Sequence, residues 1–332
     1  MSIIIAGTGS YLPGRVVTNA EFEAFLDTSD EWIAARTGMK ERRVSTGEPT
    51  WKMGELAALK ALEAAGIGPE EIDLIVCTTV TPDYLFPSTA CMIQGAIGAV
   101  NAFAMDVEAA CTGSVYGLDM ARRYLAFDDV KTVLLVGAES LSQVANYEDR
   151  GSCILFSDGA GALVLKRGEG PYGSCLRSDA SGTHQLYCKR ERRDTPFYAA
   201  DAPFDGEQFE AELVGTTYMN GQEVYKFATA AMPEVVRGAC EQAGFIPSEL
   251  DMVVPHQANI RILETAAKRL KLPMDKICVT IERYGNNSSA SVLIGLDECV
   301  REGKVKDGHR VCLVGFGAGL TYGAAAFEYH SK

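Results

Sequence analysis

Two segments of this 332-residue chain repeat the same residues at a constant offset of 178 positions. An offset that holds over about 70 residues is not expected from chance matches among common residues. The matching pairs are Ala65-Gly66 and Ala243-Gly244, Glu71-Ile72-Asp73 and Glu249-Leu250-Asp251, Gly117-Leu118-Asp119 and Gly295-Leu296-Asp297, and Val136-Gly137 and Val314-Gly315. We predict two copies of one structural unit, residues 1–170 and 171–332, with related turns able to meet across a pseudo-twofold axis.

Short apolar runs rich in β-branched residues alternate with longer helical patterns along both units. Strands are predicted at residues 3–6, 74–77, 132–136, 162–165, 252–254 and 311–314, and a further strand at 321–329. Helices are predicted at residues 53–65, 115–127, 224–243, 260–270 and 289–302. The pattern therefore indicates an α/β protein with a largely buried mixed sheet.

Charge and hydropathy exclude two classes of partner. The chain carries 31 basic and 44 acidic residues, a net charge of −13, whereas nucleic-acid binding relies on a broad basic surface. No run approaches the roughly 20 apolar residues that span a bilayer. The start, Met1-Ser2-Ile3-Ile4-Ile5, lacks the basic residues and cleavage site of a signal peptide. We therefore expect a cytoplasmic protein without nucleic-acid or membrane partners.

The ten cysteines show no metal-binding or redox spacing, because the two closest in sequence are 13 positions apart. Cys111 differs from the others in its surroundings: it follows an apolar segment and precedes Thr112-Gly113-Ser114 and a predicted helix. A thiol at a strand-to-helix turn lies at the positive end of the helix dipole, which lowers its pKa. Cys111 is therefore a candidate nucleophile, with a buried structural cysteine as the alternative. Cys77, Cys153 and Cys312 lie within strand patterns and are interpreted as structural.

His256 is the histidine whose position suits catalysis. It follows a predicted strand and opens His256-Gln257-Ala258-Asn259 just before a helix, whereas His184, His309 and His330 lie in irregular, charged or terminal stretches. Ligands of open α/β sheets gather at the carboxyl ends of strands, so an imidazole at this position is suited to acid-base chemistry. A hydrogen-bonded structural histidine is the alternative interpretation.

Two glycine-containing turns complete the set of strand-end motifs. Gly285-Asn286-Asn287-Ser288-Ser289 precedes the second-half helix, and the repeat makes Ser289 the counterpart of Cys111. Asn286 either caps that helix or donates its amide N–H to a ligand oxygen. Gly315-Phe316-Gly317-Ala318-Gly319 follows a strand and offers backbone N–H donors at a point of close approach, but lacks dinucleotide-binding spacing.

These motifs together resemble the thiolase-fold condensing enzymes, and within them the β-ketoacyl-(acyl-carrier-protein) synthase III family, over nearly the whole chain. Further matching motifs are Asp30-Glu31-Trp32-Ile33, Arg36-Thr37-Gly38, Phe86-Pro87-Ser88, Asp149-Arg150-Gly151, Ser157-Asp158-Gly159-Ala160-Gly161-Ala162 and Asn259-Ile260-Arg261-Ile262. The resemblance implies a five-layered α-β-α-β-α subunit, usually a homodimer, that initiates fatty-acid synthesis. It implies acyl-CoA and the malonyl-acyl carrier protein as substrates, with no cofactor and no metal.

The resemblance also implies a role for each site residue. Cys111 would carry the acyl group as a thioester, and His256 and Asn286 would donate N–H groups to the malonyl thioester oxygen during decarboxylation. The backbone N–H groups of Cys111 and Ala318 would hold the oxyanion of acyl transfer. The remaining implied contacts are Trp32, Arg36 and Arg150 with CoA, Arg261 with the carrier protein, and Phe86 with the partner's acyl pocket across the dimer interface.

Two departures from the family pattern affect the pocket: Ala318 stands where glycine is common, and Asn287-Ser288-Ser289 replaces the commoner Thr-Ser-Ala. The stretch 180–218 is longer than in typical members and includes Lys189-Arg190-Glu191-Arg192-Arg193. The interval 170–222, with several prolines and glycines, is predicted to lack regular elements and to form either a binding loop or a solvated excursion. A specialised acyltransferase of a secondary-metabolite pathway is the main alternative function. A non-catalytic partner subunit is disfavoured because the cysteine, histidine and asparagine are all present.

Overall fold

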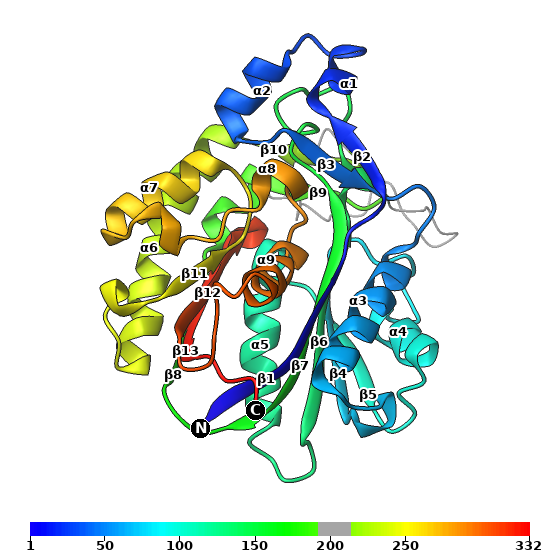
Figure 1. Ribbon diagram of the computed structural model, residues 1–332. Helices are drawn as coiled ribbons and strands as arrows, with labels where there is room; N and C mark the ends of the chain where they lie inside the picture. The colour runs from blue at the N-terminus through cyan, green and yellow to red at the C-terminus, as the bar shows by residue number, and fades with distance from the viewer. Residues whose placement is uncertain (192–213) are drawn as a thin grey trace, which may run out of the picture.

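The computed structural model describes residues 1–191 and 214–332, which fold into two packed sheets (Figure 1). The first sheet has the strand order β1 (Ser2–Tyr11), β7 (Asp158–Gly168), β6 (Thr132–Ser140), β4 (Leu74–Thr78) and β5 (Phe103–Val107). The second has the order β11 (Met252–Pro255), β12 (Arg310–Gly317), β13 (Thr321–Glu328) and β8 (Tyr172–Ser178). Strands β4, β5 and β6 run parallel, as do β11 and β12, so their carboxyl ends lie at one edge of each sheet.

Helices form three further layers around these sheets (Figure 1). Helices α5 (Gly113–Tyr124) and α9 (Ala290–Arg301) lie between the sheets, and their apolar residues share one buried cluster with both. The outer faces are covered by α3 (Thr50–Ala65) and α4 (Thr89–Ile97) on one side, and by α6 (Gly221–Ala243) and α7 (Ile260–Leu270) on the other. The result is the expected α-β-α-β-α arrangement. Among the described residues, no helix combines the length and apolar character that crossing a bilayer requires.

Residues that the sequence repeat pairs occupy equivalent places in the two halves of the structure. Each central helix carries a buried aspartate paired with the arginine four positions later, Asp119 with Arg123 and Asp297 with Arg301, both at 2.7 Å. The strands β4, β6, β7 and β1 of the first half occupy the same order as β11, β12, β13 and β8 of the second. The chain therefore consists of two pseudo-symmetric halves, as predicted.

All predicted strands and helices are present, with boundaries shifted by a few residues. The sequence pattern missed the short elements beside the carboxyl ends of the sheets: β2 (Arg15–Thr18), α1 (Asn19–Glu23), α2 (Asp30–Thr37), β3 (Glu41–Val44), α8 (Ile281–Tyr284), β9 (Leu186–Cys188) and β10 (Thr217–Met219). Single 3₁₀ turns lie at Pro69–Glu71, Ala110–Thr112, Leu141–Val144, Ala180–Gln185, Pro247–Glu249, Met274–Lys276 and Ala318–Leu320. Elements of three to eight residues give too few side chains for a periodic pattern.

The prediction that residues 170–222 lack regular elements is wrong for the described part of that interval. β8 pairs antiparallel with β13 over seven residues, and β9 pairs with β10. The proline and glycine residues that suggested a loop include Gly170 and Pro171, which form the turn before β8, while Pro196, Pro203 and Asp205-Gly206 lie outside the described residues. Sheet pairing with β13 compensates for the weak local pattern of β8.

Candidate active site

Cys111 lies in the 3₁₀ turn Ala110–Thr112, between β5 and the first turn of α5. Ala110 has a φ of +45°, a conformation that non-glycine residues rarely adopt and that the turn into α5 imposes. The hydroxyl of Thr321, on β13 of the other half, lies 2.9 Å from the Ala109 carbonyl oxygen and 3.0 Å from the Thr112 hydroxyl. The second half of the chain thus contacts the Cys111 turn on both sides of the cysteine.

The glycines of the terminal turn allow this close packing. A Cβ atom at Gly317 would lie 2.9 Å from the backbone nitrogen of Cys111, and one at Gly315 would lie 2.7 Å from the Cα atom of Thr112. Real Cβ atoms essentially never lie this close to other heavy atoms, so a side chain at either position would displace the Cys111 turn. Glycine is therefore required here for packing, and Ala318, the next residue, lines the same cavity as Cys111.

His256 directly follows β11, and its backbone N–H donates to the Val314 carbonyl at 2.8 Å, which continues the pairing with β12. The ring is buried against Phe316 edge to face, with centroids 5.3 Å apart. Its Nδ1 lies 2.8 Å from the Ser291 hydroxyl, which itself donates to the Ser288 carbonyl at 2.6 Å. The Ser291 hydroxyl has one proton and can give it either to that carbonyl or to Nδ1, so the neutral ring is held through Nδ1 in either tautomer; when Nδ1 accepts, Nε2 carries the N–H.

Asn286 lies between α8 and α9 and is tied to the first half by its backbone. Its N–H donates to the Leu155 carbonyl at 3.0 Å, and its carbonyl accepts from the Ser157 N–H at 2.9 Å. Its side-chain Oδ1 accepts the Ser288 N–H at 2.9 Å, which leaves the amide NH₂ free to donate into the cavity. The neighbouring Asn287 instead donates to the Asp158 carbonyl at 3.0 Å, so Asn287 is structural.

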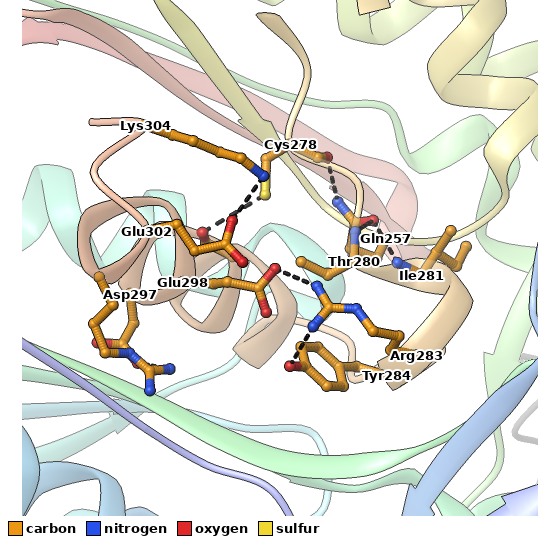
Figure 2. A network of polar contacts seen from close by, with 12 residues as sticks. Gln257, Cys278, Thr280, Ile281, Arg283, Tyr284, Asp297, Glu298, Glu302 and Lys304 are labelled. Carbon is orange, nitrogen blue, oxygen red and sulfur yellow. Dashed lines mark hydrogen bonds and ion pairs between the residues drawn. The ribbon is translucent and has the colours of Figure 1, made fainter. Parts of the chain in front are cut away.

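Gln257 connects the histidine strand to the segment that carries Asn286 (Figure 2). Its buried amide group donates to the Cys278 carbonyl at 3.0 Å and accepts the N–H groups of Thr280 and Ile281 at 3.0 and 3.1 Å. Figure 2 also shows Arg283, on α8, ion-paired with Glu298 on α9. These contacts fix α8 against the strand end, and with it the turn that leads to Asn286.

One cavity of about 800 Å³ brings these residues together. Its inner part is lined by Cys111, His256, Asn286, Ser288, Phe316, Gly317 and Ala318, and its apolar wall includes Val80, Leu141, Leu155 and Phe156. A pocket of this size with a few convergent polar groups is typical of a small-molecule site. No cluster of three or more metal-ligating side chains is found among the described residues.

The electrostatics of Cys111 differ from the sequence-based expectation. Burial raises the pKa of the Cys111 thiol to about 12, the opposite of the decrease expected from its position before a helix. The nearby Ser288 hydroxyl lowers the pKa of Cys111, whereas the Glu139 carboxylate raises it further. The prediction of a depressed thiol pKa is therefore wrong, and the thiol is neutral near pH 7 until a proton acceptor is engaged.

Burial acts on His256 in the opposite direction, because the charged form of an imidazole is its protonated form. The pKa of His256 is lowered to about 4, and the Ser288 carbonyl opposes this shift. At neutral pH the ring is therefore uncharged.

The residues expected to contact CoA lie together at the mouth of the cavity. The Trp32 ring, on α2, is flanked by two guanidinium groups, with Arg36 at 4.2 Å and Arg150 at 5.2 Å from its centroid. Trp32 and Arg36 line the cavity, and Arg150 is also bound to the Asp27 carboxylate. An aromatic face beside two cations is suited to a nucleotide base with phosphates.

The remaining predicted contacts lie at the surface. Arg261, on α7, is exposed and donates to the Ala35 carbonyl of α2 at 2.7 Å. It therefore lies beside the helix that carries Trp32 and Arg36, two of the residues expected to contact CoA. Phe86 is 84% exposed and lies outside the cavity of its own chain. Of the basic cluster, Lys189 and Arg190 line the cavity mouth, whereas Arg192 and Arg193 lie outside the described residues.

Comparison with known families agrees with this geometry. The family model of 3-oxoacyl-[acyl-carrier-protein] synthase III matches residues 105–182, and the model of its C-terminal part matches residues 240–329. The chain belongs to the 3-oxoacyl-[acyl-carrier-protein] synthase III family. This synthase III family member is an acyltransferase-type condensing enzyme with the thiolase-like fold, so the predicted fold, family and enzyme class are confirmed.

Individual relatives extend the match to the whole chain. A β-ketoacyl-[acyl-carrier-protein] synthase III of Clostridium acetobutylicum is 44% identical over 330 residues, which are 99% of each chain. The crystal structure of the synthase III of Aquifex aeolicus VF5 has a TM-score of 0.89 and 41% identity, covering 99% of this chain and 100% of that one. The priming β-ketosynthase of the R1128 polyketide pathway has a TM-score of 0.88 and 34% identity, covering 99% of this chain and 97% of that one.

Sequence reasoning missed four polar residues that shape this synthase III site: Glu139, Gln257, Ser288 and Ser291. Gln257 and Ser288 lie in motifs already singled out for a neighbouring residue, and Ser291 lies in the predicted helix 289–302. Glu139 is a polar residue near the carboxyl end of β6, the same kind of position that identified His256 beyond β11. A systematic search for polar residues near predicted strand ends would have found it.

Proposed function

We propose that this chain catalyses the decarboxylative Claisen condensation of an acyl-CoA primer with malonyl-acyl carrier protein, the step that initiates fatty-acid synthesis. The observation that carries the proposal is the convergence of Cys111, His256 and Asn286 on one largely apolar cavity. A thiol, an imidazole and a primary amide supply the nucleophile and the N–H donors that this reaction requires.

The first half-reaction transfers the acyl group to the enzyme. The Cys111 thiolate attacks the thioester carbonyl carbon of acyl-CoA, the new C–S bond forms, and CoA leaves as the bond to its sulfur breaks. The backbone N–H groups of Cys111 and Ala318 hold the oxyanion of the tetrahedral intermediate. The apolar wall around Leu141 and Phe156 accommodates the acyl chain.

The second half-reaction forms the carbon–carbon bond. Malonyl-carrier protein loses CO₂, and negative charge develops on its thioester oxygen, where the Asn286 amide donates directly. In the neutral tautomer whose Nδ1 accepts from the Ser291 hydroxyl, His256 donates its Nε2–H to the same oxygen, so no proton has to be supplied to the ring. The carbanion then attacks the acyl thioester, and Cys111 is expelled from the 3-ketoacyl product.

We further propose a homodimer. Strand β5 lies at the edge of the first sheet, and its first residue, Phe103, is 46% exposed. The segment Tyr84-Leu85-Phe86 is also largely exposed, an apolar set that a second copy of the chain would cover. In such a dimer, Phe86 reaches the partner's acyl pocket. Cytoplasmic location and independence from cofactors and metals stay predictions.

Incubation with a panel of acyl-CoAs tests the proposed function. The intact protein should gain the mass of one acyl group, and the acylated protein should then convert malonyl-carrier protein into the 3-ketoacyl form with release of CO₂. The panel should contain acetyl, branched and longer primers, since an apolar cavity fits all three classes. A protein that is acylated by none of them contradicts the proposal.

The alternative is a specialised acyltransferase of a secondary-metabolite pathway. It is favoured by the long stretch 180–218 and by the similarity to the R1128 priming ketosynthase. Acylation only by unusual primers, or transfer of the acyl group to an acceptor other than malonyl-carrier protein, would identify this function.

Carrier-protein docking gives a prediction about charge. Arg261→Glu should raise the KM for malonyl-carrier protein about tenfold, because it replaces attraction for an acidic partner with repulsion at the cavity mouth. Acylation by acyl-CoA should change little. The wild-type KM should also rise with salt, since exposed charges are screened over a Debye length of about 8 Å at physiological ionic strength.

Lys131→Glu is the matched control, an exposed charge reversal at the start of β6, the end of the strand away from the cavity. It should leave this KM unchanged. Kinetics that respond to charge reversal at Arg190, Arg192 and Arg193 but not at Arg261 would move the docking surface to that basic cluster.

A further inference from the structure

Glu139 is a fully buried carboxyl group near the end of β6 that the proposed reaction does not use. Its Oε2 accepts the Val80 N–H at 3.0 Å and the hydroxyls of Thr79 and Thr81 at 3.2 and 2.9 Å. Among residues 1–191 and 214–332, Glu139 forms no ion pair. Burying a carboxylate without a cation costs folding free energy, so the presence of Glu139 beside this site needs an explanation.

The other carboxyl oxygen, Oε1, is positioned to gain or lose a proton. The Ser289 hydroxyl lies 3.1 Å from Oε1 and 3.2 Å from the Thr78 carbonyl, but it has one proton and can donate to only one of them. With Glu139 ionised, Ser289 donates to Oε1. With Glu139 protonated, Oε1 donates to Ser289, which turns to the Thr78 carbonyl. Oε1 of Glu139 therefore has a hydrogen-bond partner in both protonation states, and that partner is the Ser289 hydroxyl in each.

Ser288 connects this carboxyl group to the nucleophile. Its hydroxyl is buried and has no geometrically satisfactory hydrogen-bond partner within the described part of the chain, and its φ of +47° is unusual for a non-glycine residue. The side chain lines the cavity beside Cys111, and its hydroxyl stabilises the ionised forms of both the Cys111 thiol and the Glu139 carboxyl. A strained serine with an unengaged hydroxyl between two ionisable groups is placed to pass a proton between them.

We propose that Cys111 and Glu139 share a single negative charge through the Ser288 hydroxyl, with Glu139 receiving the thiol proton as the thiolate forms. Ser288 gives its proton to Oε1 of Glu139 and takes the proton of the Cys111 thiol, so one S–H bond breaks and one O–H bond forms. The proton stays on Glu139 while Cys111 carries the acyl group and returns when the condensation expels Cys111. CoA leaves as a thiolate and is protonated by solvent. This inference rests on the proposed function for the role of Cys111.

The ionisation properties of the buried groups agree with a shared charge. Burial raises the pKa of Glu139 to about 7, and the Glu139 charge is one cause of the raised pKa of Cys111. The other titratable group that faces Glu139 is the Cys77 thiol of β4, which burial keeps neutral. On the neighbouring strand β7, Asp158 is bound by Ser45 and Ser142. Two further titratable groups face Cys111 itself: the Glu108 carboxylate, whose charge also raises the pKa of the thiol, and the neutral His256 ring, which lines the same cavity.

Alkylation by iodoacetamide, read at the Cys111 peptide by mass spectrometry between pH 5 and 9.5, tests the inference. The peptide readout is needed because Cys91 and Cys188 are also exposed. In the wild type, the Cys111 rate should rise about tenfold per pH unit and bend to a shallower slope near pH 7, where Glu139 becomes charged and opposes the thiolate.

Glu139→Gln should remove the bend, because glutamine keeps the shape but never becomes charged. Its Cys111 should then be alkylated about tenfold faster than in the wild type at pH 9, since a neighbouring like charge raises a thiol pKa by one unit or more. Ser288→Gly, which suits the left-handed backbone, should slow alkylation about tenfold at every pH because the thiolate loses a donor. Glu55→Gln, a buried carboxyl on α3 that pairs with Lys52 and does not line the cavity, is the control and should follow the wild-type curve.

Each contrary outcome overturns the inference. A wild-type curve without a bend near pH 7 would overturn it even if Glu139→Gln does not fold. A bend that persists in Glu139→Gln would assign the shared charge to another group, and His256, which lines the same cavity as Cys111, would be the first candidate. A Glu139→Gln variant that is alkylated no faster than the wild type at pH 9 would indicate a merely structural role. Since iodoacetamide replaces both substrates, these results are independent of whether the chain uses acyl-CoA.

Discussion

Cys111→Ser should abolish stable acyl labelling by acyl-CoA, with a loss on the order of 10⁴-fold or more. A serine hydroxyl fits the space under the terminal glycine turn, because it is smaller than the thiol, but it has far lower reactivity near neutral pH. Intact-mass spectrometry after incubation with the best primer of the panel measures the effect. The unmodified mass should persist at incubation times that fully acylate the wild type.

Cys188→Ser is the matched control for this variant. Cys188 is exposed, lines the same cavity and lies on β9, so it is the thiol best placed to be acylated by accident. The control should be acylated at the wild-type rate. Acyl mass on Cys77, Cys153 or Cys188 of a Cys111→Ser protein that is still labelled would contradict the assignment of the nucleophile.

His256→Ala and Asn286→Ala should each slow malonyl decarboxylation about 10²–10³-fold, the usual scale for the loss of one oxyanion donor. Acylation of Cys111 should survive better, because its oxyanion is held by backbone N–H groups that neither substitution removes. The measurement is CO₂ release from malonyl-carrier protein compared with acyl labelling of the same preparation. The ratio of the two losses separates the half-reactions.

His330→Ala serves as the control, since His330 lies near the C-terminus and pairs with Glu328. It should leave both half-reactions unchanged. Equal loss of acylation and decarboxylation in the His256 and Asn286 variants would show that these side chains instead maintain the fold around Cys111. Such an equal loss is a possible result for His256, because Ser291 holds the ring through Nδ1 whether or not Nε2 acts in catalysis.

Local sequence patterns were sufficient for the main elements of this fold. The core strands β4, β6, β11 and β12 were predicted from continuous apolar runs, and the amphipathic helix α7 from its strong apolar periodicity. The constant offset between the halves predicted the pseudo-symmetry, since equivalent turns need the same glycine and aspartate residues in both copies. Elements such as α2 and β8 were missed because packing and sheet pairing, rather than local propensity, hold them.

For the candidate site too, the sequence determined some features and the tertiary structure decided others. The sequence alone determined which residue types stand at the strand ends, and therefore gave Cys111, His256 and Asn286 as candidate catalytic residues. Only the tertiary structure decided their electrostatics, because a pKa depends on how far water is excluded, and burial raised the thiol pKa where the helix N-terminus alone predicted a decrease. The structure likewise placed Glu139 and Ser288 beside Cys111, since residues separated by 28 to 177 positions become neighbours only when the two halves pack together.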